Sequence, residues 1–185
     1  MSRRTRWILL ALIVAIVGGA IAVIVVERPK LDDARSAVDR HWKPLRAPDQ
    51  LVLRYQKLEG ALSAFDAAGG SDRGVSKDLH GALAAWTQAL NRGDAGSQAN
   101  AANAVEAQAT RLIANVLGSE RLKADKASTD ALTTFATTKP NAALVVAYNR
   151  AVRAYESERT GTLEQPVARV LGFDARPILV LGAGF

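Results

Sequence analysis

The chain has 185 residues, with 24 lysines and arginines against 18 aspartates and glutamates, a formal net charge of +6 and no cysteine. The absence of cysteine excludes disulfides, thiolate nucleophiles, cysteine-ligated metals and a lipidated cysteine. Five basic residues and one acidic residue lie in positions 1–30, which leaves 19 basic against 17 acidic residues, mixed along the sequence, in 31–185. No basic block forms a phosphate-binding stripe there, so we predict no nucleic-acid partner.

An apolar run, WILLALIVAIVGGAIAVIVV, covers residues 7–26 and follows a basic amino-terminal segment, residues 1–6. A helix rises about 1.5 Å per residue, so this run would span about 30 Å, the thickness of the hydrocarbon core of a bilayer. We therefore predict a transmembrane helix over 7–26. The alternative is a signal peptide cleaved after Ala20-Ile21-Ala22, so removal of residues 1–22 stays open.

The orientation of this span follows from the arginines in the amino-terminal segment. A short segment with three arginines is costly to move across a bilayer, whereas a long downstream domain translocates largely regardless of its charge. We expect a single-pass protein of the cell membrane, with its amino terminus inside and the following domain extracytoplasmic. Basic residues also follow the span, so a cytoplasmic domain is the alternative.

Beyond the span, the composition and the apolar spacing predict an all-α domain. Alanine is abundant and favours helix. Apolar residues at alternating steps of three and four predict helices over about 51–65, 76–91 and 95–117, and a last helix from about Pro140. Each has one apolar stripe, so residues 31–172 are expected to form an antiparallel bundle of about four long helices.

Two prolines leave the start of this bundle open. Pro44 and Pro48 either kink one long helix or divide it, and Pro48 stands where the first residue of the helix over 51–65 would. The apolar C-terminal tail, residues 173–185, also has two interpretations. It folds back along the bundle, or it is exposed and contacts a partner or the membrane.

The last helix combines an apolar stripe with a polar flank. Four large side chains share the stripe, which predicts that its tyrosines are mostly core: Leu144, Tyr148, Val152 and Tyr155. Asn149 and Arg153 share the flank, on which Glu156 can pair with the arginine. These two are the candidate interaction residues. The alternative for them is a hydrogen bond or ion pair within the bundle.

Side chains suited to catalysis are few. The two histidines, His41 and His80, lie far apart, and neither has a second ligand at the spacing of a metal site. A di-metal carboxylate bundle would need a Glu-x-x-His motif on two helices, and the sequence contains none. We predict no catalytic, cofactor-binding or metal-binding residue, and no enzyme.

The end of the last helix and the stretch after it carry a family resemblance. AYNRAVRAYES followed by EQPVARVLGFDARP resembles the closing signature of the LemA family, a Tyr-Asn-x-x-Val-x-x-Tyr helix that leads into a proline, an apolar turn and Gly-Phe. The matching positions are Tyr148, Asn149, Val152, Tyr155, Pro166, Ala168, Leu171, Gly172 and Phe173. Glu156 stands where the family usually has asparagine, so the chain resembles a divergent member. The resemblance implies a short tail, one membrane span and a helical bundle, with structural roles for the signature residues and no catalytic chemistry.

Together these features predict a membrane-anchored protein-interaction or scaffolding module at the cell envelope. It would be integral in the membrane through one span, with an unknown protein partner, and homo-oligomerisation is left open. The alternative is an extracytoplasmic ligand-sensing helical domain that acts through a partner. The short basic segment would leave such a sensor no cytoplasmic output module of its own.

Overall fold

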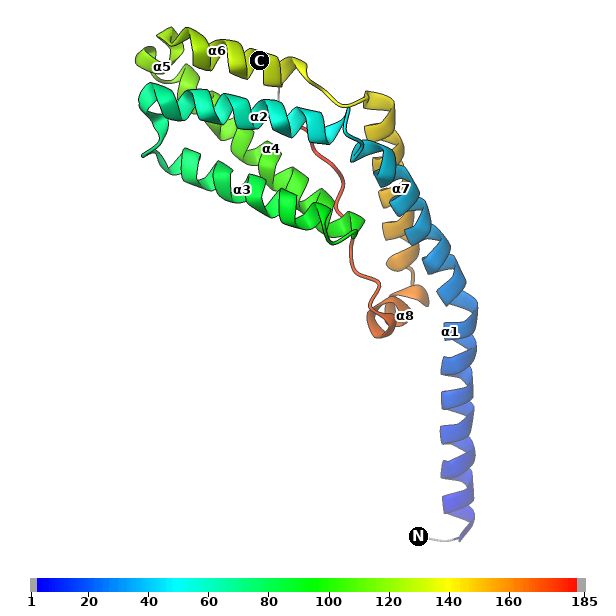
Figure 1. Cartoon of the computed structure of the whole chain (residues 1–185). Coiled ribbons are helices and arrows are strands. Elements are labelled where there is room, and N and C mark those ends of the chain that lie inside the picture. The colour runs from blue at the N-terminus through cyan, green and yellow to red at the C-terminus, as the bar shows by residue number, and fades with distance from the viewer. Residues whose placement is uncertain (1–2, 183–185) are drawn as a thin grey trace.

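The computed structural model describes the backbone of residues 3–182 and the side chains of Trp7, Leu12, Ala15, 17–19 and 21–182. This part of the chain consists of eight α-helices and one π-helical turn, and contains no β-strand. The predicted all-α class is therefore confirmed. The helices separate into a four-helix group and a second group around the first helix (Figure 1).

The first helix, α1 (Arg3–Leu45), is the longest element, and its amino-terminal part projects away from the other helices (Figure 1). Pro29 lies inside it without ending it. Four large apolar residues of its second half are buried: Leu31, Val38, Trp42 and Leu45. The helix therefore joins the projecting part to the protein core without an intervening loop.

Pro44 and Pro48 divide α1 from α2 (Leu51–Phe65). The residues between the helices form successive tight turns, in which Ala47 N–H donates to Pro44 O and Gln50 N–H to Ala47 O. The helical bonding of α2 starts with Arg54 N–H donating to Gln50 O at 3.0 Å. The expectation that Pro48 is the first helical residue is therefore wrong, because the chain completes these turns before the helix begins.

Four helices pack together into the first group. They are α2, α3 (Gly74–Leu90), α4 (Ala95–Leu117) and α6 (Lys126–Thr137). The π-helical turn η1 (Asp66–Gly70) and the short helix α5 (Glu120–Ala124) lie in the connections. Helix α3 packs mainly on α4, and α2 on α6 (Figure 1). Tyr55 of α2 meets Trp86 of α3 edge-on, with the ring centroids 5.0 Å apart.

The second group forms around the buried half of α1. Helix α7 (Ala142–Arg159) runs antiparallel to α1, and α8 (Glu164–Leu171) packs on α1 nearer its amino terminus (Figure 1). Trp42 of α1 contacts Tyr148 of α7, with the ring centroids 4.9 Å apart. These contacts seat the carboxyl-terminal half of α1 against the last long helix.

Gly172 ends α8 and turns the chain back toward the bundle. Its φ of +71° lies in the left-handed region that glycine adopts without steric penalty, as is common where helices end. Phe173 N–H then donates to Ala168 O at 2.9 Å. Residues 173–182 continue in extended conformation toward the four-helix group (Figure 1), so the described part of the C-terminal tail folds back along the bundle.

No helix in the described part of the chain is both long enough and apolar enough to cross a membrane. The side chains of residues 1–6 and several of those in the predicted span over 7–26 lie outside the described residues, as do residues 183–185. The predicted boundaries at residues 7, 26 and 31 all fall inside α1, and the boundary at residue 172 falls directly after α8. These divisions stay predictions.

Candidate functional site

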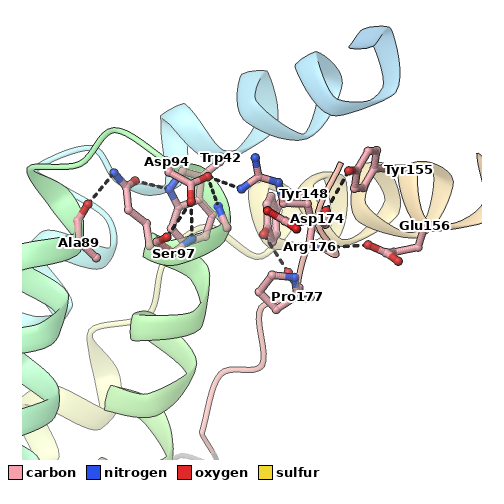
Figure 2. A network of polar contacts seen from close by, with 12 residues as sticks. Trp42, Ala89, Asp94, Ser97, Tyr148, Tyr155, Glu156, Asp174, Arg176 and Pro177 are labelled. Carbon is pink, nitrogen blue, oxygen red and sulfur yellow. Dashed lines mark hydrogen bonds and ion pairs between the residues drawn. The ribbon is translucent and has the colours of Figure 1, made fainter. Parts of the chain in front are cut away.

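Polar side chains of α4, of its N-cap residue and of α7 bind the C-terminal tail, most of them through the tail backbone (Figure 2). On α7 these groups come both from the apolar stripe, as the hydroxyls of Tyr148 and Tyr155, and from the polar flank, as the side chains of Asn149 and Glu156. We call these side chains the tail site. Its members are Asp94, Asn103, Glu106, Tyr148, Asn149, Tyr155 and Glu156.

Two buried tyrosines of α7 bind the first part of the tail. The hydroxyl of Tyr155 donates to the carbonyl oxygen of Asp174, and that of Tyr148 donates to the carbonyl oxygen of Pro177, each at 2.8 Å (Figure 2). Burial raises the pKa of both tyrosines, which keeps the hydroxyls protonated as donors. The rings therefore pack in the core while their hydroxyls fix the path of the tail.

Two asparagines bind the middle of the tail from opposite edges. The amide of Asn149 accepts from Leu179 N–H at 2.8 Å and donates to Leu179 O at 2.9 Å. The amide of Asn103 donates to Ile178 O at 2.7 Å and accepts from Val180 N–H at 2.9 Å. Successive peptide groups of an extended chain point to alternate edges, so two amides satisfy this backbone without a neighbouring strand.

Arg176 attaches the tail to both helix groups. Its backbone N–H donates to Glu156 Oε1 at 2.7 Å, and its guanidinium forms an ion pair with Asp94 (Figure 2). Asp94 is also the N-cap of α4, where it accepts from the backbone N–H groups of Gly96 and Ser97. Partial burial raises the pKa of Asp94, but the hydrogen bonds from Arg176, Ser97 and Gly96 outweigh it and hold that pKa well below its usual value.

A buried ion pair lies beneath the far end of the tail. Arg54 and Glu106 are at most 3% exposed and form two hydrogen bonds, of 2.7 Å from Nε and 2.9 Å from Nη2. Arg54 also donates to the carbonyl oxygens of Phe135 and Thr138. Glu106 Oε2 accepts a further hydrogen bond from Gly182 N–H at 2.9 Å. The tail thus reaches a charge pair that connects α2 to α4 and to the end of α6.

Trp42 connects α1 to the same region. Its indole N–H donates to Gln98 Oε1 at 2.6 Å, and the amide of Gln98 donates in turn to Ala89 O at the end of α3 (Figure 2). Gln98 is fully buried. A buried indole N–H without a partner would be destabilising, so this chain of hydrogen bonds fixes α1 against α3 and α4.

The residues of the resemblance fall at different depths in the structure. Tyr148, Val152 and Tyr155 are buried, as the stripe predicted. Phe173 is buried as well, and Gly172 has the left-handed conformation described above. Pro166, by contrast, is exposed on α8.

The two candidate interaction residues differ in environment. Asn149 is half-buried and bonded to the tail, which is the within-bundle alternative, whereas Arg153 is exposed. The suggested pairing of Arg153 with Glu156 is wrong. Glu156 Oε2 instead accepts from Arg159 at 2.7 Å, and its Oε1 accepts from Arg176 N–H, so both carboxylate oxygens are engaged by other partners.

Sequence reasoning missed four residues of this arrangement: Asp94, Asn103, Glu106 and Arg176. Two local signals were present. Asp94 directly precedes an apolar-periodic segment, the usual place of an N-cap, and Glu106 interrupts an alanine-rich apolar stripe. Nothing in the sequence pairs them with the tail, because the partners lie 75 to 82 residues apart.

The histidines do not join the tail site. His41 is exposed on α1. His80 lies 3.0 Å from Asp66, beside a groove of about 420 Å³ between α2 and α3, and Ser76 donates to the same carboxylate at 2.6 Å. The hydroxyl and the imidazole both bind the carboxylate and not each other, which is not the geometry of an activated nucleophile. The described residues contain no cluster of three metal-ligating side chains.

Comparison with family models, with curated proteins and with solved structures found no match to this chain. The resemblance to the LemA family therefore depends on the C-terminal residues quoted above.

Proposed function

We propose that this protein is a single-pass membrane protein of LemA type, anchored through residues 7–26, whose helical bundle acts by contact with another protein at the cell envelope. One observation carries the anchor. Within residues 7–26, Val23 and Ile24 are partly buried, and the other large apolar side chains that the structure describes are exposed: Trp7 (67%), Leu12 (58%), Val17 (51%), Ile21 (56%), Val25 (66%) and Val26 (57%).

Exposure of these apolar side chains to water would be unfavourable. Burying apolar surface is worth about 25 cal/mol per Å², and soluble monomers rarely leave a continuous apolar surface uncovered. A bilayer would cover the whole projecting part of α1. Because the same helix continues to Leu45 in the core, the anchor and the bundle would be joined by regular helix. The bundle would then stand at a defined height above the membrane.

The contacts of the signature residues support the LemA assignment. Tyr148, Asn149 and Tyr155 act together to hold the tail, and Gly172 provides the turn that brings the tail back to them. These positions therefore form one structural unit, in keeping with the structural role that the resemblance implies.

The proposed activity is contact with a protein partner, not catalysis. The polar groups of the tail site are engaged with the C-terminal tail, and Ser76 and His80 both bind Asp66, which is not the geometry of an activated nucleophile. Arg153 remains the candidate contact residue on α7, because its side chain is exposed. Arg153→Ala should reduce recovery of the partner that the unaltered protein captures from solubilised membranes, and unchanged recovery would remove this residue from the proposal.

The location of the bundle can be tested with one introduced cysteine, because the chain has none. Ser71 is exposed in the connection between α2 and α3. Ser71→Cys should react with a membrane-impermeant maleimide in intact cells if the bundle is extracytoplasmic. Protection until lysis would place the bundle in the cytoplasm. The matched control is Ala61→Cys, which is fully buried and should stay unlabelled in both conditions while the fold is intact.

A further inference from the structure

Helix α8 packs against a part of α1 that belongs to the predicted span. Between the two helices lies a cavity of about 260 Å³ that is open to the surface and has almost entirely apolar walls. Val23 and Ile24 of α1 form one side, and Leu163, Pro166 and Val170 at α8 form the other. The cavity therefore joins the apolar surface of the span to that of α8.

Helix α8 and its N-cap Leu163 present one broad apolar face, and only part of that face is buried in the described core. Val167 and Ala168 are 4% and 2% exposed and face the protein. Leu163, Pro166 and Val170 follow at steps of three and four, which places them on a common stripe. Val170 is 74% exposed and Leu163 57% exposed, as much as the residues of the span itself. In water this exposed stripe has no stabilising role.

The depth of α8 follows from its contacts on α1. Val23 and Ile24 precede Val26, the end of the apolar run, by two or three residues, which is about 3–5 Å along a helix. A bilayer that covers α1 as far as Val26 must therefore reach the level of the cavity between α1 and α8. The exposed stripe of α8 would then lie at the depth where the acyl chains begin.

The charges near this level suit the headgroup region. Arg28 and Lys30 are exposed about one turn beyond Val26, and Arg169 is exposed on α8. The Glu27 carboxylate beside them is buried and accepts from Lys30 at 2.8 Å. Long basic side chains can extend to phosphate while their stems stay against apolar surface.

We infer that α8 is a second membrane contact: its exposed stripe of Leu163, Pro166 and Val170 inserts at the boundary between headgroups and acyl chains, and acyl chains fill the cavity against Val23 and Ile24. The inference depends on the proposed anchor. With both contacts the bundle is held at a fixed tilt on the membrane, whereas the α1 anchor alone would allow the tilt to vary.

Fluorescence quenching by nitroxide-labelled lipids tests this contact on the full chain. Three single-cysteine variants carry the same environment-sensitive dye in vesicles of equal parts phosphatidylcholine and phosphatidylglycerol: Val17→Cys in the span, Val170→Cys on α8 and Lys126→Cys on α6. All three side chains are exposed, so the substitutions should leave the fold intact. Lys126 lies in the four-helix group, so a dye at this position should not touch lipid and serves as the unquenched reference.

The inference predicts that lipids labelled near the headgroup quench the dye at position 170 strongly and at position 126 hardly at all. It also predicts that lipids labelled deep in the acyl chain quench position 17. Quenching at 17 with position 170 as unquenched as 126 would overturn the α8 contact and leave the anchor in place. Absence of quenching at 17 would overturn the anchor and the α8 contact together.

Discussion

Asn149→Ala should weaken the attachment of the C-terminal tail and destabilise the protein. The side chain makes two hydrogen bonds, of 2.8 and 2.9 Å, to the backbone of Leu179. Leu179 itself is 2% exposed. A typical hydrogen bond contributes about 1 kcal/mol, and a buried partner left unpaired costs about 1–3 kcal/mol. The variant should therefore lose about 2–3 kcal/mol of the free energy of unfolding.

Arg153→Ala is the matched control, because Arg153 lies one turn farther along the same helix and is exposed. Exposed substitutions usually change stability by less than about 0.5 kcal/mol. Urea unfolding of the full chain in detergent, followed by tryptophan fluorescence, compares the two. For a chain of this size, about 2–3 kcal/mol corresponds to a fall in Tm of roughly 4–12 °C.

The tail supplies a second test of the same reasoning. In a variant that lacks residues 177–185, Asn149 has lost its partner, so Asn149→Ala should have little further effect. Equal urea midpoints for Asn149→Ala and Arg153→Ala would refute the account of the tail site. An undiminished effect of Asn149→Ala without the tail would refute it as well.

Three other substitutions test the core, the ion pair of the tail and α2. Glu106→Ala leaves the buried guanidinium of Arg54 unpaired and should cost about 3–5 kcal/mol in urea unfolding. Burial raises the pKa of Asp94, but the hydrogen bonds from Arg176, Ser97 and Gly96 outweigh it and hold that pKa below 3.8, so this stabilisation is present above about pH 4 and is lost as the pH falls further. Asp94→Asn, which keeps an N-cap, should flatten that part of the curve of urea midpoint against pH. Gly60 lies inside α2 with open space around its missing side chain, so Gly60→Ala should stabilise by about 1 kcal/mol, and a lower midpoint would contradict this.

Local patterns in the sequence predicted many of the buried helix faces. The steps of three and four through Tyr55, Trp86 and Tyr148 mark stripes that are buried in the structure. Such patterns predict burial because each helix buries one face, and the spacing of apolar residues in the helix's own sequence defines that face. They could not decide between a kink and a break at Pro44 and Pro48, because a kinked helix and a turn can both accommodate proline, which has no amide hydrogen to donate.

The tail site could not be predicted to the same degree. The stripe identified Tyr148 and Tyr155 as core residues, but nothing local showed that their hydroxyls would bind backbone 19 to 29 residues away. Asn103 is half-buried on an alanine-rich helix and resembles any polar residue on a solvated flank. Its role depends on where an extended segment lies, and an extended segment with side-chain partners has no periodic signal of its own.

The anchor is the central claim, and alkaline carbonate extraction of membranes from cells that produce the full chain tests it most directly. The matched control is a variant without residues 7–26, which keeps the buried half of α1 from Leu31 to Leu45. The account predicts that the full chain stays in the membrane pellet and that the variant moves to the supernatant. Extraction of the full chain into the supernatant would contradict it.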